Sequence, residues 1–103
     1  MDSFSLQMEE DAIYAILDYI EDNLSEPDKK MPVEEFTKRS AERWAAFEMI
    51  GRMEEFPYEN PLMIVLSFYK EMEKYAEFRP ERRLIFESAK ELAMKIFEIL
   101  YEL

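Results

Sequence analysis

The chain has 103 residues, 49% of them hydrophobic and 36% charged, and its net charge is −11. It contains neither histidine nor cysteine, and only one glycine. This excludes catalytic triads, Cys-His nucleophile pairs, the usual zinc, haem and iron–sulfur sites, and the glycine-rich loops that hold phosphates.

The excess of acids disfavours direct binding to nucleic acid or to an anionic membrane. No apolar run is long enough to span a bilayer, and the N-terminus lacks the pattern of a signal peptide. We therefore expect a single domain over residues 1–103, located in the cytoplasm, with no cofactor and no metal ion.

The prolines all fall between stretches of helical periodicity. Pro32, Pro61 and Pro80 are each placed in the first turn of a helix, where the missing N–H does no harm, and Asn60 is the expected N-cap of the third helix. These signals predict an all-α protein, a single antiparallel four-helix bundle without strands. The predicted helices span about residues 5–24, 32–54, 61–76 and 80–103.

The first helix is amphipathic. Its predicted core face consists of Ile13, Ile16, Leu17, Ile20 and Leu24, and the opposite face carries Asp11, Asp18 and Asp22. These acids could simply be solvated, could mimic the phosphates of a nucleic acid, or could hold a divalent metal ion. The first thirty residues contain nine acids and two lysines, so this end of the chain is the most acidic.

The second helix carries a stripe formed by Val33, Phe36, Trp44 and Phe47, with Ser40 and Gly51 on the same line. We expect the small residues to permit a close helix crossing within the bundle. Alternatively, Gly51 ends the helix as a left-handed cap.

Met49 and Met53 lie away from this stripe. Exposed methionines form adaptable binding surfaces, whereas the alternative role of such residues is to fill the core. We include both methionines among the candidate partner-binding residues.

The third and fourth helices have broader apolar arcs than a four-helix core requires. At the start of the fourth helix, Arg79, Arg82 and Arg83 lie near the positive end of the helix dipole, where cations are mildly unfavourable. Either acids of the chain itself compensate these arginines, namely those of the acid-rich first helix or Glu77 and Glu81, or a partner's carboxylate or phosphate does.

The surplus apolar surface predicts a non-enzymatic protein that acts through protein–protein contacts, as a homodimer. The candidate partner-binding residues are Met49, Met53, Arg79, Arg82 and Arg83. The alternative is an acidic decoy that uses Asp11, Asp18 and Asp22 to occupy the nucleic-acid groove of another protein. A third hypothesis is a magnesium- or manganese-dependent enzyme that relies on carboxylates and arginine.

Overall fold

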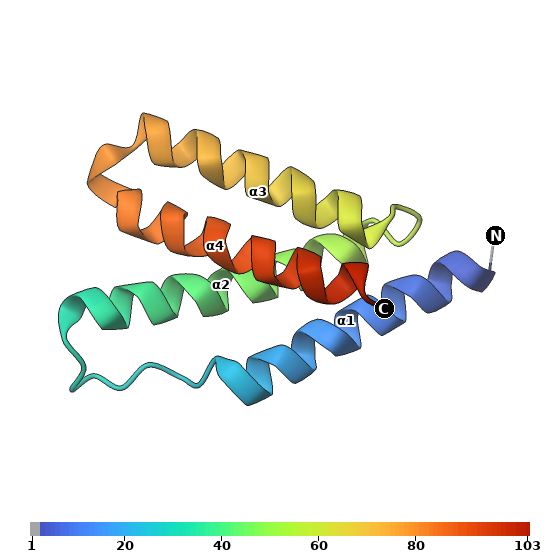
Figure 1. Cartoon of the computed structure of the whole chain (residues 1–103), viewed down its shortest axis with the longest axis horizontal. Coiled ribbons are helices and arrows are strands. Elements are labelled where there is room, and N and C mark those ends of the chain that lie inside the picture. The colour runs from blue at the N-terminus through green and yellow to red at the C-terminus, as the bar shows by residue number, and fades with distance from the viewer. Residues whose placement is uncertain (1–2) are drawn as a thin grey trace.

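The computed structural model describes the backbone of residues 3–103 and the side chains of residues 8–103. Successive helices run in opposite directions along the long axis of the molecule (Figure 1), and the described residues contain no strand. The all-α four-helix bundle predicted from the sequence is therefore confirmed. Its elements are α1 (Ser3–Asn23), α2 (Val33–Glu55), α3 (Pro61–Phe78), the short 3-10 helix η1 (Pro80–Arg82) and α4 (Arg83–Tyr101).

The prolines begin the helices in three different ways. Pro61 is the first residue of α3, and the side chain of Asn60 accepts a hydrogen bond of 2.9 Å from the backbone N–H of Leu62, as the sequence predicted. Pro32 instead occupies the N-cap position of α2, with extended backbone angles (φ −53°, ψ 144°). Pro80 begins η1, and the fourth α-helix starts only at Arg83.

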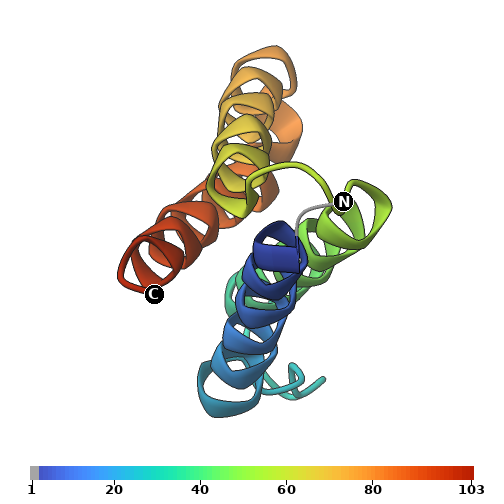
Figure 2. The ribbon, with the colours of Figure 1, turned by 90° about the vertical axis from the view of Figure 1, so that its right-hand side faces the viewer.

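The four helices do not pack equally closely. α3 and α4 form the most extensive helix pair, and α4 also packs along α2. α1 packs less extensively against each of its neighbours than the helices of these two pairs pack against each other. Viewed along the bundle, α1 and α2 form one layer and α3 and α4 the other (Figure 2). α1 is therefore the peripheral helix.

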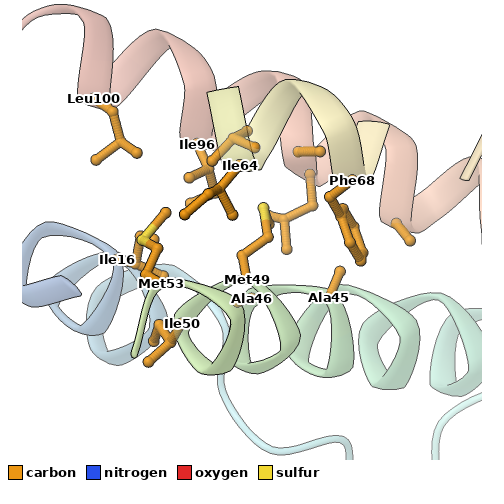
Figure 3. Close-up of a cluster of buried hydrophobic side chains, with 14 of the residues drawn as sticks. Ile16, Ala45, Ala46, Met49, Ile50, Met53, Ile64, Phe68, Ile96 and Leu100 are labelled. Carbon is orange, nitrogen blue, oxygen red and sulfur yellow. The ribbon is translucent and has the colours of Figure 1, made fainter. Parts of the chain in front are cut away.

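The core lies where α2 faces α3 and α4, and Ile16 reaches it from α1 (Figure 3). Ala45 on α2 and Ala89 and Ala93 on α4 are completely buried. Such small side chains let two helix backbones approach closely, which fits the long contact between α2 and α4. Larger residues fill the remaining space, and the largest that are fully buried include Phe68, Met72 and Ile96.

No helix within residues 3–103 combines the length and the apolar character needed to cross a membrane.

Candidate protein-interaction surface

Helix α2 has two apolar faces. The buried face, here called the inner face, consists of Ala41, Ala45, Ala46, Met49, Ile50 and Met53. The stripe that was predicted to lie in the bundle occupies roughly the opposite side of the helix. With a turn of about 100° per residue, the centre of the stripe lies about half a turn around the helix axis from the centre of the inner face. The prediction that this stripe packs in the core is therefore wrong.

We define the outer stripe as the following six residues of α2: Val33, Thr37, Ser40, Trp44, Phe47 and Gly51. None of them is fully buried, and Val33, Trp44 and Phe47 expose 83%, 45% and 47% of their surface. The stripe contains no charged residue, although the chain carries a net charge of −11. It is thus an uncharged, largely apolar strip on an acidic protein.

Gly51 has neither of the roles predicted for it. It lies inside α2, which continues to Glu55, and no residue in the described chain has a positive φ, so Gly51 is not a left-handed cap. A Cβ atom at Gly51 would have no atom of another helix within 4 Å, so no helix crosses there. In the isolated chain Gly51 faces open space.

Met49 and Met53 are 0% exposed, so the expectation that they form a partner surface is wrong for this fold. Figure 3 shows both side chains pointing from α2 towards α3 and α4, near Ile64 and Ile96. Their flexible thioethers fill the space beside the small residues of the inner face. The alternative use of these residues, core filling, is what the structure has.

The seam between α2 and α3 is held by an ion pair. The Arg52 guanidinium donates to the Glu71 carboxylate at 2.9 and 3.3 Å and lies 5.1 Å from the centre of the Phe68 ring. The hydrogen bonds from Arg52 lower the pKa of Glu71, and Glu71 in turn raises the pKa of Arg52. Trp44 packs against the same phenylalanine, with ring centroids 5.9 Å apart. One side of Trp44 is therefore fixed by the core, while the other remains exposed.

A shallow groove of about 290 Å³ lies beside the N-terminal half of the outer stripe. Thr37, Ser40 and Trp44 form one wall, and Ile85, near the start of α4, contributes to the other. The lining is predominantly apolar, and it includes three of the six stripe residues. The surface is thus hollowed where the stripe carries its small hydroxyl residues.

Arg43, which flanks the stripe, has a structural role. Its guanidinium donates a hydrogen bond to the backbone carbonyl of Leu24, just after the end of α1, and lies 5.6 Å from the centre of the Phe47 ring. This contact satisfies a carbonyl that the helix itself leaves without a partner. Arg43 therefore fastens the connection from α1 to α2 and supports Phe47 from one side.

The acids of α1 face solvent. Asp11, Asp18 and Asp22 are exposed, and residues 3–23 contain six acids and no basic residue. Asp11 and Asp18 also border an open groove of about 580 Å³ between α1, the start of α3 and the end of the chain. Across residues 8–103, acidic side chains do not gather in a group of three that could hold a metal ion.

The arginine group is exposed at the turn from α3 to α4. Arg83 pairs with Glu87 at 3.3 Å and Arg79 with Glu81 at 3.8 Å, so neighbouring acids compensate two of the three arginines. Arg82 has no ion pair within the described side chains. None of the pairs involves the acids of α1, which were one predicted source of compensation.

No known protein family, curated protein or solved structure matches this chain. Within the described side chains, the outer stripe is an uncharged, largely apolar and partly exposed surface along a single helix.

Proposed function

We propose that this chain is a non-enzymatic protein that works through protein–protein contacts and does so as a homodimer. The observation that carries the proposal is the outer stripe, which exposes Trp44 and Phe47 on an otherwise acidic chain. Contiguous apolar surface of this kind marks an interaction site in small proteins. A second copy is the first partner to consider, because two-fold homodimers are the commonest oligomers.

Light scattering during gel filtration tests this proposal. We expect a mass of about twice the 12.5 kDa of the chain at micromolar or higher concentration. A mass that stays at one chain over the whole accessible concentration range would contradict the homodimer.

The second candidate function is an acidic decoy for a nucleic-acid-binding protein. One observation supports it: α1 exposes Asp11, Asp18 and Asp22 and carries no base over residues 3–23. Its binding to a basic groove should weaken steeply with salt, as nucleic-acid binding does. Replacing the three aspartates by lysine should abolish capture of such proteins, and unchanged capture would refute the decoy.

A further inference from the structure

The outer stripe has the spacing of a coiled-coil seam. Its six positions are separated alternately by four and three residues, which is the 3.5-residue repeat of helices that pack along each other. At a rise of 1.5 Å per residue, the stripe is about 27 Å long. It therefore offers a straight, continuous surface to another helix.

The order of the side chains along the stripe matters for self-association, because the bulky Trp44 and Phe47 are consecutive in it and lie between the small Ser40 and Gly51. If two copies of α2 paired in parallel, identical residues would face each other, so that indole would meet indole and glycine would meet glycine. Such layers combine collisions with voids, both of which destabilise an interface.

Antiparallel pairing removes this conflict. The two core positions of a heptad are called a and d. In an antiparallel seam, each a position of one helix faces a d position of the other, and the two-fold axis makes every such pair occur twice. Each layer then contains one larger and one smaller side chain, as interdigitating packing requires. The facing pairs between one copy and the other are Val33 with Gly51, Thr37 with Phe47, and Ser40 with Trp44.

We infer that two copies of this chain associate through the outer stripe of α2, antiparallel and in this register. The inference rests on the proposed homodimer and specifies its interface. The groove beside the stripe fits this register, because Thr37 and Ser40, which face Phe47 and Trp44 of the second copy, line that hollow. The aromatic side chains of each copy thus enter a depression on the other.

The stripe itself adds no charge to an interface between two copies. α1, with its six acids, packs against α2 near Ile50 and Met53 of the inner face (Figure 3). Two chains of charge −11 repel each other, and an interface along the stripe places no charged side chain at its centre. Glu34 of one copy approaches Glu48 of the other in this register, so higher ionic strength should strengthen the dimer.

The exposed area is that of a reversible dimer. Because an aromatic side chain presents about 150–250 Å² in total, the exposed parts of Trp44 and Phe47 amount to about 70–115 Å² each. With Val33 and the side chains at the edges, each copy contributes several hundred Å², below the roughly 800 Å² of a standard stable interface. We therefore expect the dimer to dissociate on dilution.

The first test is a steric block with a rescue. Gly51→Trp should convert the dimer to a monomer, because the introduced indole meets Val33 of the second copy, while the monomer folds normally since open space surrounds Gly51. Adding Val33→Gly to the same chain should restore the dimer, because the introduced indole would then face a glycine. The control is Ser67→Trp, which places the same aromatic group at an exposed position of α3 and should leave the dimer intact.

The second test determines the direction of pairing by thiol cross-linking. Because the chain has no cysteine, only the introduced thiols can react. A mixture of the Val33→Cys and Gly51→Cys variants should cross-link efficiently with a short bismaleimide. Either variant alone should not, since its two thiols lie about 27 Å apart along the seam. Cross-linking of each variant with itself would indicate parallel pairing and would overturn the register.

The outcomes separate this inference from the proposed function. A wild-type chain that is dimeric and unaffected by Gly51→Trp would refute the stripe as the interface and leave the homodimer standing. A wild-type chain that is monomeric by light scattering would refute both. Loss of the dimer in Gly51→Trp, with rescue by Val33→Gly and cross-linking only in the mixture, is the result we expect.

Discussion

The two apolar faces of α2 differ in composition in an unexpected way. The inner face is built of alanine, methionine and isoleucine and is completely or almost completely buried, whereas the outer stripe carries the tryptophan and a phenylalanine and is exposed. The difference follows from the neighbours. α4 presents Ala89 and Ala93 to the bundle, so the helices come close, and only small or flexible side chains fit between them.

The largest expected difference between the faces is in folding stability. Met53→Ala leaves a cavity in the core and should lower the free energy of unfolding by about 2–5 kcal/mol. Urea denaturation of the dilute protein measures this. A loss below about 1 kcal/mol would mean that the inner face is not a packed core.

Gly51→Ala should act in the opposite direction. The position is helical, is surrounded by open space and has no positive φ, so alanine adds helix propensity without a clash in the monomer. We expect an increase of about 0.5–1 kcal/mol in the free energy of unfolding of the dilute protein. A decrease would mean that some part of the chain packs closely on Gly51.

Phe47→Ala separates folding from association. In the monomer it removes the contact with Arg43, worth about 0.5–1 kcal/mol at an exposed site. In the dimer it removes an aromatic anchor, which should weaken association more than tenfold. Sedimentation equilibrium gives the dissociation constant and urea denaturation gives the stability. Equal effects on both would contradict the division between the two faces.

Glu71→Gln, at the seam between α2 and α3, should have the smallest effect. Because Arg52 lowers the pKa of Glu71 in the folded state, the pair stabilises the protein above the ordinary carboxyl pKa, and this contribution is lost as the pH falls through the folded pKa. The pair is partly exposed, so we expect about 0.2–1 kcal/mol at neutral pH.

The matching measurement is urea denaturation of wild type and Glu71→Gln at neutral and acid pH. The difference between the two proteins should shrink in acid, below about pH 4.5. A difference that is independent of pH would mean that the carboxylate charge contributes nothing.

The sequence was sufficient to predict the helices, because proline positions and an Asn-Pro cap are local signals that tertiary contacts did not override. The orientation of α2 was not predictable in the same way. Both of its faces repeat with helical periodicity, and the choice between them depends on how close α4 comes, which is a non-local property. Ala89 and Ala93 on α4 were the signal that could have identified the alanine-rich face as buried.

The candidate site was predicted only in part. The aromatic residues of the stripe were noticed but placed in the core, and Met49 and Met53 were considered for a surface because thioethers serve both roles. Thr37 and Ile85 were not considered at all, since the groove they line forms only when α4 packs beside α2. The arginines and the aspartates were correctly expected at the surface, because charged side chains rarely lack solvent.

The most direct test of the outer stripe as an association surface uses the chain's one tryptophan, Trp44, which lies in the middle of the stripe. The emission maximum and the acrylamide quenching of its fluorescence should be measured over a dilution series of the wild-type protein. We expect blue-shifted emission that is protected from quenching at high concentration, and red-shifted, readily quenched emission after dilution. The Gly51→Trp variant is not used in this measurement, because its second indole would contribute to the fluorescence. Fluorescence that does not change over a concentration range in which light scattering shows the dimer dissociating would show that the copies meet elsewhere.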